Sequence, residues 1–143
     1  MTRREAREQI LALIYEAAFQ PDRPFSELYE TTVRELPMAE DPYVRSVFLG
    51  MEEKLPELDA DIDSHTVGWK PERLAKMSRA IMRLALYEMR YSDDVPAAVA
   101  IDEAVELAKA YDDDKAPAFI NGILNAAARE RGDLGGGEKP EES

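Results

Sequence analysis

The stretch KPERLAKMSRAIMRLALYEMRY, residues 70–91, decides the fold. Its apolar side chains recur every three or four residues, which is the period of one face of an α-helix. Pro71 suits a first helical turn, and the polar run Ser92-Asp93-Asp94 ends the pattern. The stretch therefore predicts a long amphipathic helix from about 71 to 91. Its predicted buried stripe consists of Leu74, Met77, Ile81, Leu84, Ala85 and Met89.

The rest of the chain divides into further helical segments at proline and acidic breakers. Ser26 is the predicted N-cap of the second segment. Asp41 is the predicted N-cap of the third, in which Pro42 takes a first-turn position. No apolar–polar alternation of strand type occurs, so the predicted fold class is all-α with about seven helices. The other segments span about 3–19, 26–36, 42–55, 56–65, 96–111 and 117–131.

The length of 143 residues suits one domain with a sizeable core, and we expect that domain to span 1–131. Residues 132–143 contain three consecutive glycines and mostly charged residues, which predicts a disordered acidic tail. The chain has no cysteine, which excludes disulfides, thiol catalysis and cysteine-ligated metal sites. No export signal and no run long enough for a spanning helix is visible, so we expect a cytoplasmic protein without membrane contact.

Charge is distributed unevenly along the chain. The formal net charge is -12, but residues 65–91 alone carry six basic and two acidic side chains. Residues 26–63 carry eleven acidic and three basic side chains. At physiological salt, charges more than about 8 Å apart are largely screened. A basic surface on an acidic protein can therefore still attract phosphates at short range, and the net charge does not exclude a nucleic-acid partner.

The N-terminal segment has the spacing of a phosphate-binding face. Arg3 and Arg7 are four residues apart on one side of the predicted helix, and Arg4 shares a stripe with Tyr15. Guanidinium groups bind phosphates bidentately, and an exposed ring beside them can stack on an unpaired base. The other interpretation is a solvated first turn with a partly buried tyrosine, and spacing alone does not decide between the two.

The sequence gives little support to an enzyme. His65 is the only histidine, and we interpret it as a surface or capping residue, so no metal site and no cofactor is expected. The run Asp112-Asp113-Asp114 lacks the spacing of a calcium loop and is interpreted as a loop and helix-capping segment. No glycine-rich phosphate loop lies between a strand and a helix. A cleft that brings carboxylates to His65 would revive the enzymatic interpretation.

Four motifs together resemble the bacterial transcription antitermination factor family NusB. They are RREARE at 3–8, AIMRLALYEM at 80–89, VPAAVAIDEAVELAKAY at 95–111 and FINGILN at 119–125. Their order and separation agree with the family across about residues 3 to 130. The resemblance implies two small α-helical bundles packed together. It also implies binding of boxA RNA in nascent ribosomal RNA leaders, as a heterodimer with NusE, the small-subunit ribosomal protein. The implied complex joins RNA polymerase with other Nus factors, so that transcription passes termination signals.

The resemblance also implies roles for particular residues. The family's arginine-rich RNA contact corresponds to Arg3, Arg4 and Arg7, and its aromatic RNA contact to Phe119. Packing of Phe119 on Ile123 in the core is the alternative. Tyr15 corresponds to a family tyrosine near the RNA and the NusE-binding region. Lys115 is a further candidate phosphate contact, and Ser78 replaces a usually acidic residue at the NusE face. Asp102, Pro117 and Asn125 are further departures from the family pattern.

Two functions are therefore compared. The first is an RNA-binding antitermination factor that works with a ribosomal protein. The second is an all-α scaffold for protein–protein contact, with only incidental RNA affinity. We expect the first to place the Arg3, Arg4 and Arg7 face on the surface, contiguous with Lys115 and Phe119. A related domain occurs fused to RNA cytosine methyltransferases, but the length of this chain favours a standalone factor.

Overall fold

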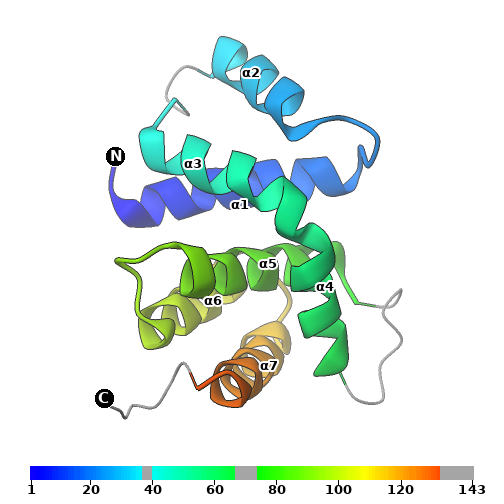
Figure 1. The fold of residues 1–143 in the computed structure, drawn as a ribbon, viewed down its shortest axis with the longest axis vertical. Coiled ribbons are helices and arrows are strands. Elements are labelled where there is room, and N and C mark those ends of the chain that lie inside the picture. Colours follow the sequence, from blue (N-terminus) through cyan, green and yellow to red (C-terminus); the bar gives the residue numbers. More distant parts are fainter. Residues whose placement is uncertain (37–39, 67–73, 133–143) are drawn as a thin grey trace. The chain divides into compact units, whose positions relative to one another are not determined.

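A computed structural model describes residues 1–36, 40–66 and 74–132, and these ranges contain seven α-helices and no strand, which confirms the predicted all-α class (Figure 1). The chain divides into two compact units, with the division between Leu55 and Pro56. None of the helices in the described ranges is both long and apolar enough to cross a membrane. The expected tail at 132–143 lies outside the described residues, apart from Gly132.

The first unit is built from α1 (Arg3–Ala18), α2 (Phe25–Glu35), α3 (Pro42–Met51) and the short 3-10 helix η2 (Glu52–Lys54). Its core forms where α1 and α3 lie side by side and α2 packs on both. The rings of Phe25 and Phe48 stack there with centroids 4.4 Å apart. The apolar side chains on the inward face of α3 are buried. They are Val44, Val47, Phe48 and Met51.

Local hydrogen bonds set the helix starts in this unit. Asp41 caps α3 as predicted, because its Oδ1 accepts from the backbone N–H groups of Tyr43 and Val44 at 2.8 and 3.2 Å. The predicted N-cap at Ser26 is wrong, since α2 already begins at Phe25 after Pro24. The Phe25 N–H donates to Glu52 Oε2 at 3.1 Å, so a distant carboxylate replaces a local cap.

The second unit contains α4 (Leu55–Ser64), α5 (Lys76–Tyr91), α6 (Ala97–Tyr111) and α7 (Ala116–Glu130). Pro71, the predicted start of the fifth segment, lies outside the described residues, but Leu74 and Ala75 are described and precede α5, so the predicted helix begins too early. Helix α6 packs on α5 and α7, and α5 also touches α7. Asp113 Oδ1 accepts from the N–H groups of Lys115 and Ala116 at 2.9 and 3.0 Å, which confirms the predicted capping role of the acidic loop. The largest buried side chains of α5 and α7 are Ile81, Met82, Leu84, Leu86, Ile120 and Leu124.

Candidate nucleic-acid interface

The first turn of α1 is fixed by a reciprocal capping box. Thr2 Oγ1 accepts from the Glu5 N–H at 3.0 Å, and the Thr2 N–H donates to Glu5 Oε1 at 2.7 Å. These backbone and side-chain bonds to Thr2 lower the pKa of the Glu5 carboxyl below its ordinary value. Arg3 and Arg4 lie inside this turn and are exposed, as predicted. The capping box therefore holds two exposed guanidinium groups on an ordered backbone.

Arg3 is held further by an aromatic ring of another helix. Its guanidinium carbon lies 3.7 Å from the centroid of the Tyr43 ring, in the first turn of α3. Stacking on a ring restricts the guanidinium plane, while N–H groups at the edge of that plane still suit a phosphate. Nothing in the local sequence pattern predicts this pair, because Tyr43 is forty positions from Arg3 and meets it only through packing of α3 on α1.

The predicted exposure of Arg7 is wrong. Arg7 is 5% exposed, whereas Arg3 and Arg4 are exposed. Leu11 and Ile14 follow Arg7 at intervals of four and seven residues, and both are buried. The buried face of α1 is therefore wider than the predicted stripe and includes Arg7. Of the three N-terminal arginines, only Arg3 and Arg4 are therefore exposed, and a phosphate contact stays a prediction for these two.

Tyr15 lies three turns along α1 from Arg4 and is half-buried, in agreement with the partly buried alternative. Its ring packs edge-on against Phe19, with centroids 5.0 Å apart and an interplanar angle of 78°. Phe19 is 56% exposed, although no sequence argument singled it out. The two rings form an aromatic pair at the end of α1, and an edge-to-face partner fixes the orientation of Tyr15.

Lys115 and Phe119 belong to the second unit, whereas Arg3, Arg4 and Tyr15 belong to the first. Lys115 is exposed at the start of α7 and Phe119 is half-buried one turn later. Packing with Ile123 therefore does not cover the whole of Phe119, since Ile123 is buried and Phe119 retains accessible surface. Contiguity of these two residues with the arginines of α1 stays a prediction.

Ser78, the expected partner contact on α5, is buried. Only 5% of it is exposed, and its hydroxyl donates to Asp112 Oδ2 at 2.5 Å. Asp112 lies at the end of α6, and its Oδ1 accepts from the Asp113 N–H at 2.8 Å. Ser78 therefore links α5 by a hydrogen bond to the loop between α6 and α7. A direct contact of its side chain with a partner would require this hydrogen bond to open.

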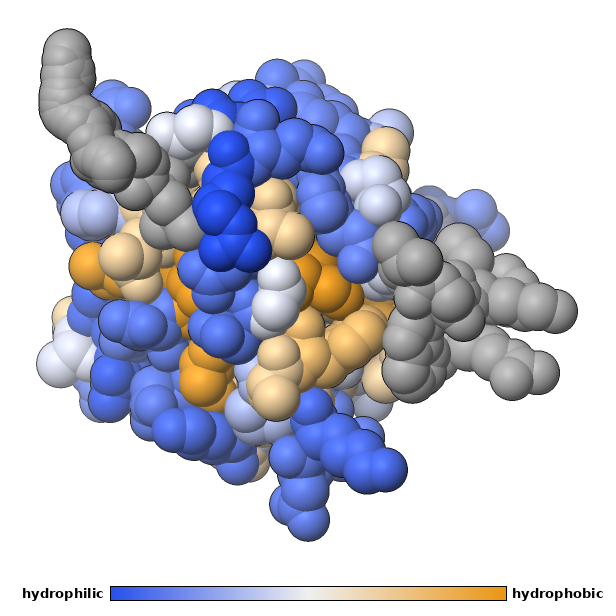
Figure 2. All heavy atoms as spheres, turned by 90° about the horizontal axis from the view of Figure 1, so that it is seen from below, coloured by the Kyte–Doolittle hydropathy of each residue, from blue (hydrophilic) through white to orange (hydrophobic). Residues whose placement is uncertain are grey.

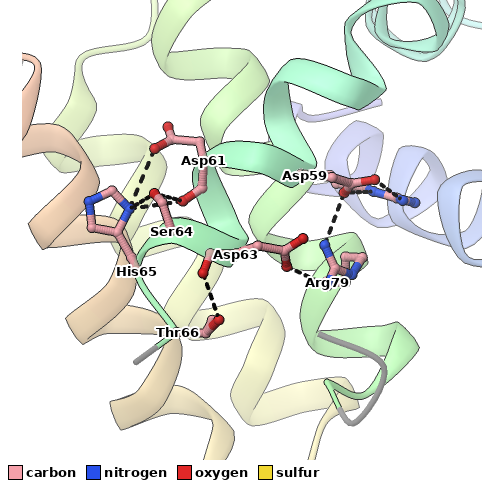
Figure 3. Close-up of polar contacts among 8 residues, drawn as sticks. Asp59, Asp61, Asp63, Ser64, His65, Thr66 and Arg79 are labelled. Atoms are coloured by element: carbon pink, nitrogen blue, oxygen red, sulfur yellow. Dashed lines mark hydrogen bonds and ion pairs between the residues drawn. The ribbon is translucent and has the colours of Figure 1, made fainter. Parts of the chain in front are cut away.

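Three of the basic side chains in the described part of the segment 65–91 pair with carboxylates of α4. Arg83 and Arg79 of α5 both reach Asp59 of α4, and Arg79 also donates to Asp63 at 2.8 Å (Figure 3). Arg90 donates to Asp61 and its side chain is only 5% exposed. Burial lowers the pKa of Arg79, but the hydrogen bond to Asp63 and the two carboxylates outweigh burial and raise that pKa. These three arginines therefore stabilise the second unit internally.

His65 is partly a capping residue, as predicted, but it is not a surface residue. Its Nδ1 lies 2.8 Å from the Asp61 carbonyl oxygen near the end of α4, and its side chain is 11% exposed. Glu130 Oε1 lies 3.4 Å from Nε2, and Asp61 Oδ1 lies 3.4 Å from Nδ1. Asp61 and Glu130 therefore each place a carboxylate oxygen near one nitrogen of the ring, and the expectation that no metal binds here stays a prediction.

Comparisons with known proteins place the whole described fold in one family. The sequence matches the NusB family over residues 4–129. The chain belongs to the NusB family. The transcription antitermination protein NusB of Bacillus pumilus is 42% identical over 126 residues, covering 87% of this chain and 93% of that protein. Its counterpart in Bacillus subtilis is 41% identical over 125 residues, with 87% and 93% covered.

Solved NusB structures share the fold. NusB of T. maritima matches with a TM-score of 0.81 and 30% identity, over 91% of this chain and 92% of that one. A chain from a complex of the antitermination factors NusB and NusE with double-stranded RNA matches with a TM-score of 0.77 at 24% identity, over 90% of this chain and 96% of that one. The family resemblance deduced from the four motifs is thereby confirmed.

Proposed function

We propose that this NusB-family chain binds the boxA element of nascent ribosomal RNA as a heterodimer with NusE. In this proposal, the heterodimer joins RNA polymerase and other Nus factors in the cytoplasm and lets transcription pass termination signals. The chain acts by binding and does not catalyse a reaction. The observation that carries the proposal is the pair of exposed arginines, Arg3 and Arg4, in a first turn held by the Thr2–Glu5 capping box.

The α1 arginines suit RNA for a physical reason. The overall charge of -12 repels a polyanion, so attraction has to come from a local group of cations. Arg79, Arg83 and Arg90 are engaged by carboxylates of α4. Arg3 and Arg4 stand in an exposed turn, with Arg3 oriented by Tyr43. Arg7 contributes by packing beneath this turn rather than by touching a phosphate.

Further RNA contacts are proposed at two aromatic positions and one lysine. The half-buried rings of Tyr15 and Phe119 each offer surface on which an unpaired base can stack. Lys115 is exposed beside Phe119 and adds a cation. Tyr15 also serves the NusE contact in this proposal. Ser78 acts there indirectly, through the hydrogen bond that holds Asp112 and the loop before α7.

Fluorescence anisotropy with labelled boxA RNA tests the function. We expect tighter binding to boxA than to a scrambled RNA of equal length, and a further gain when purified NusE is added. Replacing both Arg3 and Arg4 by alanine is expected to weaken binding to both RNAs, because phosphate contacts add affinity without sequence preference. Arg34→Ala is the matched control, because it deletes an exposed arginine of the same unit at the end of α2. Equal weak binding to both RNAs, with and without NusE, would contradict the proposal.

The alternative function is a protein-interaction scaffold with incidental RNA affinity. It draws on the large hydrophobic side chains that the second unit exposes, namely Tyr91, Val99 and Tyr111 at 38%, 43% and 49%. Figure 2 shows, on the face that it views, apolar patches surrounded by hydrophilic side chains. This alternative predicts NusE binding that does not depend on RNA and is unchanged in the Arg3 and Arg4 variant. The anisotropy series distinguishes the two functions.

A further inference from the structure

Three potential metal ligands meet at the ends of two helices in the second unit. Asp61 and His65 come from the end of α4 and the residue that follows it, and Glu130 is the last residue of α7. One ligand atom from each of the three lies within 4.8 Å of the other two. Figure 3 shows the His65 ring and Asp61 on the side of α4 away from Arg79. The cluster is therefore separate from the α4–α5 pairs formed by Asp59 and Asp63.

The hydrogen bonds of His65 identify the nitrogen that carries a proton. Nδ1 lies 2.8 Å from the carbonyl oxygen of Asp61, which can only accept. The Ser64 hydroxyl, which donates to the same carbonyl, lies 3.0 Å from Nδ1. With Nδ1 as the N–H donor to that carbonyl, the lone pair of the neutral imidazole lies on Nε2. A backbone carbonyl that accepts from one ring nitrogen, leaving the other free to bind, is the usual support of a metal-ligating histidine.

The Nε2 lone pair then faces a second acceptor. Glu130 Oε1 lies 3.4 Å away, and a carboxylate has no proton to donate near neutral pH. A cation between the two acceptors would remove the repulsion between their lone pairs. The separation is longer than an ordinary N–H···O hydrogen bond, which spans about 2.7–3.2 Å. Two ligands about 2.0–2.1 Å from one tetrahedral zinc ion lie about 3.4 Å apart, so the observed spacing suits a metal better than a shared proton.

Asp61 supplies a third donor that is already oriented. Arg90 donates to its Oδ2, while Oδ1 lies 3.4 Å from Nδ1 of His65. One oxygen of Asp61 also lies within 4.8 Å of the ligand atoms of His65 and Glu130. The Asp61 and His65 side chains are only 13% and 11% exposed, so both are held in place. Glu130 is 68% exposed and is free to adjust its side chain around an ion. A buried arginine that holds one carboxylate oxygen directs the other toward the site.

We propose that Asp61, His65 and Glu130 bind one divalent transition-metal ion of the Zn²⁺ type. One imidazole nitrogen and two carboxylate oxygens suit Zn²⁺, whereas Mg²⁺ and Ca²⁺ prefer sites made only of oxygens. Three protein ligands leave a fourth position for water. The bound ion joins the end of α4 to the end of α7 within the second unit. The site thus stabilises that unit and is independent of the RNA-binding role proposed for α1.

Calorimetric titration of tag-free, full-length protein with ZnCl₂ tests this site, after dialysis against a chelator. We expect one Zn²⁺ per chain, a melting temperature several degrees higher with Zn²⁺, and no such effect of MgCl₂. Glu130→Gln and His65→Gln are each expected to weaken Zn²⁺ binding at least tenfold. Glu130→Gln changes an exposed side chain, so folding is retained. Glu106→Gln, an exposed glutamate of α6, makes the same charge change and should leave binding intact.

Two results would overturn the metal site. One is the absence of Zn²⁺ binding, or binding that survives both Glu130→Gln and His65→Gln. The other is a melting temperature that does not change with Zn²⁺. In this case the melting temperature of the natural protein would rise as the pH falls from 8 to 5, and that of Glu130→Gln would not. The second result would assign the cation between His65 and Glu130 to a proton on the imidazole, since Asp61 and Arg90 are unchanged in that variant.

Discussion

Arg83 donates both Nε and Nη2 to the two carboxylate oxygens of Asp59, each at 2.8 Å, and thereby joins α5 to α4. Arg79 adds a third donor to the same carboxylate at 3.2 Å. The arginine side chains are 16% and 14% exposed and that of Asp59 is 30% exposed, so the group is only partly screened by water. Bidentate, partly buried pairs stabilise more than surface pairs. Much of the basic charge of α5 is consequently used inside the second unit.

Removing this shared carboxylate tests its contribution. Asp59→Ala removes the carboxylate that Arg79 and Arg83 share, and both guanidinium groups are partly buried. We therefore expect the free energy of unfolding to fall by about 1–3 kcal/mol. Glu27→Ala is the control, because its pair with Arg23 is more exposed, at 62% and 27%, and should cost well under about 1 kcal/mol. Urea unfolding followed by circular dichroism measures both. Equal costs for the two variants would show that the α4–α5 pairs do not stabilise the unit.

The capping box predicts a pH dependence at the start of α1. Hydrogen bonds from Thr2 lower the pKa of Glu5 in the folded protein, so the ionised carboxylate stabilises the folded state. That contribution is present above the unfolded pKa of Glu5 and is lost as the pH falls through the lowered, folded pKa. A carboxyl NMR titration should place the pKa of Glu5 below its usual value of 4.5. In Thr2→Ala the pKa should return only part of the way, because the variant loses the side-chain bond but keeps the backbone N–H, which is the larger cause. A pKa that does not move in the variant would contradict the capping box.

Two glycines should respond in opposite ways to alanine. A Cβ added at Gly122, inside α7, meets no atom within 4 Å, so Gly122→Ala should stabilise the protein by about 0.5–1 kcal/mol. Gly132 follows the end of α7 with φ of 78°, a left-handed conformation that favours glycine. Gly132→Ala should therefore destabilise by about 1 kcal/mol. Thermal unfolding measures the change in stability of each variant. A change of the same sign in both variants would contradict this prediction.

Burial of Arg7 gives a further prediction. Arg7→Ala should lower the free energy of unfolding by about 1–3 kcal/mol, because it removes a side chain that is only 5% exposed. Arg4→Ala, in the exposed first turn, should change it by less than about 0.5 kcal/mol. Chemical unfolding curves for the pair provide the measurement. A large cost at Arg4 with none at Arg7 would reverse the assignment of packing and surface roles.

Local patterns predicted the helices well, because their causes are local. The apolar period around Ile81 and Leu84, the cap at Asp41 and the acidic loop before α7 all act within a few residues. The family was likewise predicted from the order of four short motifs. The boundary between the third and fourth segments was predicted less precisely. The sequence placed it between 55 and 56, at Pro56, which has no N–H to continue a helix. In the structure α3 ends at Met51, and η2 lies between α3 and α4.

The site was predicted less completely, because its decisive contacts join distant residues. Arg7 has the spacing of an exposed arginine, but it is buried on the same side of α1 as Leu11 and Ile14. Tyr43 meets Arg3 through the contact of α3 with α1. Pairing of α5 arginines with α4 carboxylates depends equally on tertiary structure. A count of charges along a segment cannot reveal which of them neutralise one another.

The salt dependence of RNA binding tests the central claim most directly. The affinity of the chain with NusE for boxA RNA would be measured over a range of salt concentrations, for the natural protein, Arg3→Ala/Arg4→Ala and Arg34→Ala. If both arginines bind phosphates of single-stranded RNA, the slope of log K against log salt should become shallower by about 1.4 in the double variant. It should not change in Arg34→Ala. An unchanged slope in the double variant would show that the first turn of α1 is not the RNA contact.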